Sequence, residues 1–277
     1  LIFGIWIFPK WGVTGAAVGT LASRVTMLIF VVILLYRDPR TAAIIRQLVP
    51  KRLYKKELNQ LLQLGLPSSL QMFFEVSFFT FAIWVCGFLS KDAQAANQIA
   101  LNLSSMTFMV AMGLSVAATI RVGNQKGFKA FGELKRIALS VFLLTLLLDV
   151  VFAGVFVACN EWLPWLYLDS ATGLDTFAVA ELAGSLLFIA AFFQIFDGAQ
   201  VVALGSLRGL QDVRIPTWIT FLAYVLIGVP VMLYLSIEAA MGARGVWIGL
   251  CLGLVVSSLL LYLRFRYLSN KLIRTNG

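Results

Sequence analysis

The sequence contains no histidine, and only 13% of its 277 residues are charged. The absence of histidine excludes imidazole metal sites, Ser-His-Asp catalysis and histidine proton relays. Cys86, Cys159 and Cys251 stand singly with no CxxC spacing, which predicts packing rather than redox or metal chemistry. The sequence also shows no cluster of nucleophile, base and metal ligands, so it predicts neither an enzyme nor a cofactor.

Apolar residues, by contrast, are abundant: 60% of the chain is hydrophobic and the mean hydropathy is +0.91. These values are typical of a polytopic membrane protein and far from those of a soluble domain. The net charge of +9 does not indicate a nucleic-acid partner, because the basic residues are scattered through connectors and form no single patch. We therefore predict an all-α polytopic membrane protein whose main surroundings are the lipid bilayer.

Seven apolar segments reach the roughly 20 residues that a membrane-spanning helix requires. They are predicted at residues 12–36, 61–89, 93–120, 137–159, 177–207, 213–236 and 243–265. Residues 1–8, "LIFGIWIF", are predicted to be the tail of a further helix.

Basic and non-basic connectors alternate between these segments. The long connector after the first segment and the C-terminal tail are rich in Lys and Arg, whereas the connector around Glu161 and Asp169 is acidic. Since Lys and Arg accumulate in the cytoplasmic loops of membrane proteins, the alternation predicts a cytoplasmic C-terminus. The expected location is the inner (cytoplasmic) membrane, crossed several times.

A short internal repeat suggests two related units. "GVTGAAVG" at 12–19 matches "GARGVWIG" at 242–249, with three glycines in register and each stretch opening a predicted helix. We therefore expect residues 1–37 to be the end of an N-terminal lobe, 38–60 a cytoplasmic connector and 61–277 a six-helix C-terminal lobe. On this hypothesis the chain is a fragment that opens late in the first lobe of a two-lobed transporter. The connector is expected either to lie in the headgroup layer or to be a solvated linker.

Three predicted helices each carry a polar stripe at helical spacing. Polar residues within a membrane are unfavourable facing lipid, so we expect the three stripes to face one cavity. The stripes consist of Gln71 and Glu75; Gln98, Asn102 and Ser105; and Phe193, Asp197 and Gln200. The alternative is that the amides are interhelical hydrogen-bonding groups, worth about 0.6 kcal/mol per pair.

Glu75 and Asp197 carry most of the functional argument. A carboxylate at the centre of a membrane helix costs about 2.5–3.5 kcal/mol on insertion scales, and no Lys lies within these helices to offset it. Such a group either takes up a proton or stays ionised by binding a cation, and both choices describe an ion-coupling site. The roles of Arg24 and Asp149 stay open between a structural contact and a part in coupling.

Longer stretches of the chain resemble a known transporter family. "LGLPSSLQMFFEVSFF", "AANQIALNLSSMTFMVAMGLSVAATIRVGNQKG" and "FQIFDGAQVVALGSLRGLQDVRIPT" resemble the C-terminal lobe of the multidrug and toxic compound extrusion (MATE) family. "FGIWIFPKWGVTGAAVGTLASR" resembles the end of its N-terminal lobe. The resemblance implies a twelve-helix, two-lobed, monomeric antiporter that exports small organic cations and other drugs against an inward flow of sodium ions or protons.

The resemblance also implies a site. The family's helix-7 glutamate and helix-10 aspartate fall on Glu75 and Asp197, which would then be the ligands of a sodium ion or the acceptors of a proton. An aromatic hydroxyl often precedes that aspartate by one turn; here the residue is Phe193, and the loss of this oxygen weakens the case for sodium more than for a proton.

The family's first four helices have no counterpart in this sequence. The rival hypothesis is a lipid-linked oligosaccharide flippase of related architecture. Such a flippase is expected to have a strongly cationic cavity, whereas the cavity residues predicted here are acidic.

Overall fold

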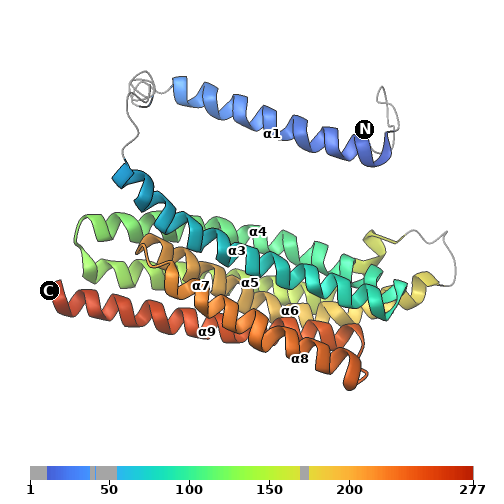
Figure 1. Cartoon of the computed structure of the whole chain (residues 1–277). Helices are drawn as coiled ribbons and strands as arrows, with labels where there is room; N and C mark the ends of the chain where they lie inside the picture. The colour runs from blue at the N-terminus through green and yellow to red at the C-terminus, as the bar shows by residue number, and fades with distance from the viewer. Residues whose placement is uncertain (1–10, 38–40, 42–54, 169–174, 277) are drawn as a thin grey trace. The chain divides into compact units, whose positions relative to one another are not determined.

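The computed structural model describes residues 11–37, 41, 55–168 and 175–276. Seven of the described helices are long and apolar enough to cross a membrane, which confirms the predicted all-α membrane architecture (Figure 1). They are α1 (Gly12–Arg37), α3 (Lys55–Leu89), α4 (Lys91–Gly127), α5 (Phe131–Ala158), α6 (Asp175–Gly209), a composite helix over 214–238, and α9 (Ala243–Asn276). Several helices extend past the predicted segments because hydropathy marks only the apolar part of a helix.

The chain divides into two compact units, Leu1–Leu58 and Asn59–Gly277. We call the second the C-terminal unit; the sequence placed its start at residue 61. The predicted N-terminal helix tail at 1–8 and most of the connector at 38–60 lie outside the described residues.

The internal repeat has a backbone counterpart. Gly12 and Gly242, which occupy matching places in the repeat, have φ angles of +54° and +60°. α1 begins at Gly12 and α9 begins directly after Gly242. This left-handed conformation suits glycine, because a Cβ would be strained there. The two stretches therefore share a local conformation as well as a sequence pattern.

Within the C-terminal unit, α4 and α6 pack closely through small residues. A Cβ on Gly209 would lie 2.7 Å from the Thr119 backbone oxygen, so only glycine permits this approach. The Ser115 hydroxyl donates to the Val201 carbonyl at 2.6 Å, and the Thr119 hydroxyl donates to the Gly205 carbonyl at 2.9 Å. Small residues and interhelical hydrogen bonds of this kind hold helices together in a bilayer, where the hydrophobic effect does not.

The composite helix alternates between α-helical and π-helical turns. It runs through α7 (Arg214–Phe221), η2 (Leu222–Gly228), α8 (Val229–Leu233) and η3 (Tyr234–Glu238). The Val229 N–H donates to the Tyr224 carbonyl five residues back, immediately before Pro230, which has no N–H to donate. A π turn is often found at functional sites, and this one carries Tyr224, which is completely buried.

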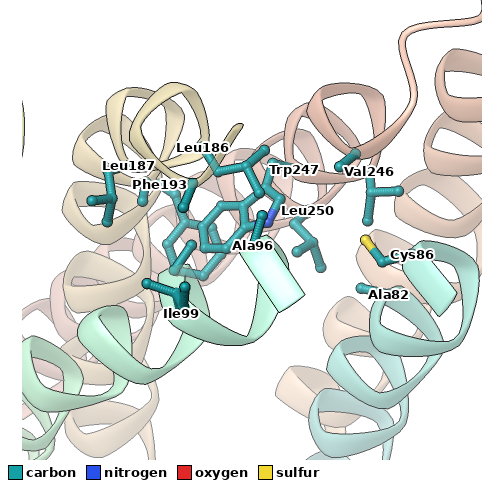
Figure 2. Close-up of a cluster of buried hydrophobic side chains, with 14 of the residues drawn as sticks. Ala82, Cys86, Ala96, Ile99, Leu186, Leu187, Phe193, Val246, Trp247 and Leu250 are labelled. Carbon is teal, nitrogen blue, oxygen red and sulfur yellow. The ribbon is translucent and has the colours of Figure 1, made fainter. Parts of the chain in front are cut away.

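The main core of the C-terminal unit lies between α3, α4, α6, α9 and the composite helix. Figure 2 shows Phe193 among Ile99, Leu186 and Trp247, with the free thiol of Cys86 buried in the same cluster. The Phe193 and Trp247 ring centroids are 5.3 Å apart in an edge-to-face arrangement. The Trp247 indole N–H donates to Asn97 Oδ1 at 2.9 Å, which satisfies its one polar atom.

α3 joins this unit largely through aromatic rings. Phe78 stacks on Tyr224 with a centroid distance of 4.9 Å and an interplanar angle of 11°. A Cβ on Gly228 or Gly253 would lie 2.5 Å or 2.9 Å from the tip of the Phe78 ring. Phe78 therefore occupies a slot that exists only because both neighbours are glycine.

Candidate functional site

A cavity of about 310 Å³ opens between α3, α4 and α6. Its wall is mainly apolar, and its charged members come from α3 and α6. The lining consists of Met72, Glu75, Val76, Phe79, Leu101, Ser104, Ser105, Phe108, Met112, Phe193, Asp197, Val201, Leu204 and Arg208. A largely apolar pocket with a few convergent polar groups is the usual form of a small-molecule site.

Glu75 and Asp197 line this cavity together, from α3 and α6 respectively. Asp197 is 5% exposed, and its Oδ1 has no hydrogen-bond partner among the described residues. The two carboxylates are close enough to repel each other electrostatically. Two negative charges facing one apolar cavity favour the binding of a cation or a proton between them.

Arg208 is the charged cavity residue that the sequence analysis missed. It stands in the last turn of α6, and its Nη2 donates to Gln71 Oε1 at 3.1 Å. Its guanidinium attracts the Glu75 carboxylate. The sequence placed Arg208 in a connector, whereas the structure makes it part of the cavity wall. Gln71, buried as expected, reaches the site through this hydrogen bond rather than by lining the cavity.

The predicted α4 stripe reaches the cavity only in part, because Ser105 lines it whereas Gln98 and Asn102 do not. The Gln98 and Asn102 side chains are exposed on the C-terminal unit. Successive residues are about 100° apart around a helix, so Asn102 is rotated by about a quarter of a turn from Leu101, which lines the cavity. The buried polar residues of this part of α4 are instead Asn97 and Ser104.

Gln200 lies behind the cavity wall. It is completely buried, and neither its amide nitrogen nor its amide oxygen has a hydrogen-bond partner among the described residues. Its side chain faces the Tyr224 hydroxyl, which also interacts electrostatically with Glu75 and Asp197. Tyr224 thus brings a phenol near both carboxylates from a different helix, while position 193 carries no hydroxyl. A tyrosine inside a predicted membrane helix was the only sequence signal for it.

Aromatic rings form part of the cavity wall. Phe193 lines the cavity as expected, together with Phe79 and Phe108. Three phenylalanines close to Glu75 and Asp197 in the sequence are absent from the lining: Phe74, Phe78 and Phe196. The Phe74 ring packs on Phe221 at 5.1 Å, and Phe78 packs on Tyr224. Both rings serve to hold α3 in place.

Asp149 belongs to the contact between α5 and α6. It is 3% exposed, and its backbone oxygen accepts a hydrogen bond from Gln194 Nε2 at 3.3 Å. Its carboxylate lies directly against Gly198, where a Cβ would overlap it, and it interacts electrostatically with Asp197. Asp149 is therefore a neighbour of the site that does not line the cavity.

Comparisons with known proteins identify the family and the fold. The family model MatE matches residues 67–233 of this chain. The probable multidrug resistance protein NorM of Brucella suis biovar 1 (strain 1330) is 34% identical over 283 residues, covering 96% of this chain and 56% of the relative. The multidrug resistance protein NorM of Photobacterium profundum is also 34% identical, covering 96% and 58%. The chain thus spans a little over half the length of these curated relatives.

Solved structures show the same fold. A MATE protein in complex with MaL6 superimposes with a TM-score of 0.83 at 18% identity, covering 99% of this chain and 60% of that chain. An outward-facing multidrug resistance MATE family transporter of the MOP superfamily gives a TM-score of 0.82 at 19% identity, covering 99% and 59%. These matches confirm the predicted fold class. The chain therefore belongs to the MATE family of transporters, as the family match over more than half of its length shows.

Proposed function

We propose that this protein is a cation-coupled antiporter that exports organic cations and drugs across the cytoplasmic membrane. The observation that carries the proposal is the single cavity onto which Glu75 and Asp197 both open. The names of its relatives, which are multidrug resistance proteins, support the same substrate class. Residues 61–277 would form the C-terminal lobe of the transporter and residues 1–37 the end of its N-terminal lobe.

The mechanism that fits this cavity is mutual exclusion. The coupling cation and the organic cation compete for Glu75 and Asp197, so one must leave before the other binds. A ligand shifts the balance between outward-open and inward-open states only by its differential affinity for the two. Each positive charge that enters down a potential of 100 mV contributes about 2.3 kcal/mol, enough to concentrate a substrate substantially.

The coupling ion in this proposal is sodium or a proton. A sodium ion needs several oxygen ligands, and the Phe193 ring supplies none. A proton needs only one carboxylate oxygen, which favours the proton at Glu75 or Asp197.

A lipid-linked oligosaccharide flippase remains the second candidate. Its pyrophosphate-bearing substrate calls for a cavity with several cationic side chains. The cavity here contains one guanidinium and two carboxylates, so its charge favours a cation. We further propose a monomer with a cytoplasmic C-terminus, based on the alternation of basic connectors.

Proteoliposomes containing the product of the complete gene test the proposal. Efflux of a fluorescent organic cation is measured under an imposed sodium gradient and then under a proton gradient, for wild type, Glu75→Gln and Asp197→Asn. Gradient-driven transport that both substitutions abolish, with folding preserved, is expected. Normal transport by Glu75→Gln would show that Glu75 is structural. Preserved drug resistance with loss of cell-wall synthesis on gene deletion would favour the flippase.

A further inference from the structure

The cavity contains a fixed positive charge. Arg208 follows Asp197 by about three helical turns on the same face of α6, roughly 16 Å further along the axis. Side chains on a helix lean towards its N-terminus, so Arg208 reaches back along the cavity towards Asp197. α3 runs past it with Gln71 one turn before Glu75. The guanidinium thus belongs to the lining of the same cavity as the two carboxylates.

Only part of the guanidinium is engaged by the protein. Its Nη2 donates to Gln71 Oε1 at 3.1 Å, while its buried Nε has no hydrogen-bond partner among the described residues. The one ion pair within the described part of the chain joins Asp212 and Arg264, and Arg208 is not in contact with Glu75 at that range. Arg208 therefore attracts Glu75 without neutralising it by direct contact.

Formal charges then decide what the cavity can accept. Glu75, Asp197 and Arg208 are the charged residues of the lining, and with both carboxylates ionised they sum to a single net negative charge. Arginine remains protonated in proteins, so this positive charge does not leave with the coupling ion. A cavity of net charge −1 is balanced by one monovalent cation and overcompensated by a divalent one.

We propose that Arg208 determines the charge selectivity of this cavity, favouring singly charged cations over doubly charged ones. This inference rests on the proposed function, because it concerns the organic cations that the cavity would bind. Arg208 repels a bound dication twice as strongly as a bound monocation. For unit charges roughly 10 Å apart at an effective dielectric constant of about 20, the repulsion between Arg208 and each positive charge of the ligand lowers the affinity of that ligand about tenfold. Removing the charge should therefore shift the preference towards dications about tenfold.

Ethidium and propidium provide a matched pair of probes. They share one fluorescent, planar aromatic cation, and propidium carries an additional quaternary ammonium group. Their dissociation constants are measured by fluorescence titration of the complete gene product in nanodiscs. The variants are Arg208→Gln, Arg208→Lys and Arg214→Gln; Arg214 is an exposed cation nearby that does not line the cavity.

We expect wild type, Arg208→Lys and Arg214→Gln to share one propidium-to-ethidium affinity ratio, and Arg208→Gln to raise it about tenfold. Gln71→Glu, which adds a carboxylate beside Arg208 with little change of shape, should raise it in the same direction. This second variant keeps the test decisive if Arg208→Gln does not fold. If Arg208→Gln or Gln71→Glu folds and has the wild-type affinity ratio, the inference is wrong. Arg208 is then a cation that stabilises the end of α6.

The proposed function fails separately. If wild type binds neither dye, or if Glu75→Gln binds both as tightly as wild type, the cavity is not the organic-cation site, and the inference falls with it. If Glu75→Gln loses binding while both charge variants keep the wild-type ratio, the function stands and only the role of Arg208 is wrong.

Discussion

Gly249→Ala should separate α9 from α8. A Cβ on Gly249 would lie 2.5 Å from Met232 Cα, 2.6 Å from its Cβ and 2.7 Å from its backbone nitrogen. Two of these atoms belong to the backbone of α8, and Met232 is completely buried, so none can move aside easily. Overpacking of this kind lowers the free energy of unfolding by about 1–3 kcal/mol.

Gly154→Ala provides the matched control. Gly154 also lies within a long helix, α5, but a Cβ there meets nothing within 4 Å. Both substitutions gain about 1 kcal/mol of helix propensity, so the difference between them isolates the contact with Met232. A change of 1 kcal/mol in the free energy of unfolding shifts the melting temperature by roughly 2–4 °C in a chain of this size. A loss of about 2 kcal/mol at the Met232 contact therefore separates the melting temperatures of the two variants by roughly 4–8 °C.

The assay follows loss of helical circular dichroism on heating, with both variants in the same detergent and at the same scan rate. Gly249→Ala should melt below Gly154→Ala, and Gly154→Ala at or above wild type. Equal midpoints for the two variants would refute the close approach of α8 and α9 and with it the role given to this glycine.

Trp247→Phe should lower the free energy of unfolding by about 1–3 kcal/mol, because it leaves the completely buried side-chain oxygen of Asn97 without its donor. Unchanged thermal stability would contradict this hydrogen bond. An ion pair joins Asp212 and Arg264 at 2.8 Å, and both side chains are partly exposed. A double-mutant cycle should therefore give a coupling energy of at most about 1 kcal/mol. A coupling energy that high salt does not reduce would count against this expectation.

Much of the fold could be predicted from the sequence because hydropathy and length decide which segments span a bilayer. The placement of Glu75 and Asp197 on one cavity could also be predicted, since each had few favourable alternatives to facing the protein interior. The rotation of each helix about its own axis was harder to predict. Gln98 and Asn102 share a stripe, yet packing turns the adjacent stripe of Asn97 and Ser104 inwards.

Arg208 escaped prediction for a different reason. A charge at the end of an apolar segment normally marks a connector, and the sequence pattern does not show which way its long side chain points. Tyr224 escaped because its position depends on a π turn, which neither hydropathy nor helical periodicity reveals. Both residues required the packed structure before they could be assigned to the site.

The slot that holds Phe78 has a consequence for how mutations in this protein would be interpreted. Phe78 and Glu75 lie one turn apart on α3, so the glycines that admit the ring also set the height and rotation of the carboxylate. Gly228 and Gly253 are absent from the cavity lining. A genetic screen for loss of the proposed drug export would nevertheless recover substitutions at both glycines, and these would resemble binding-site mutants in every assay except one that measures the position of α3.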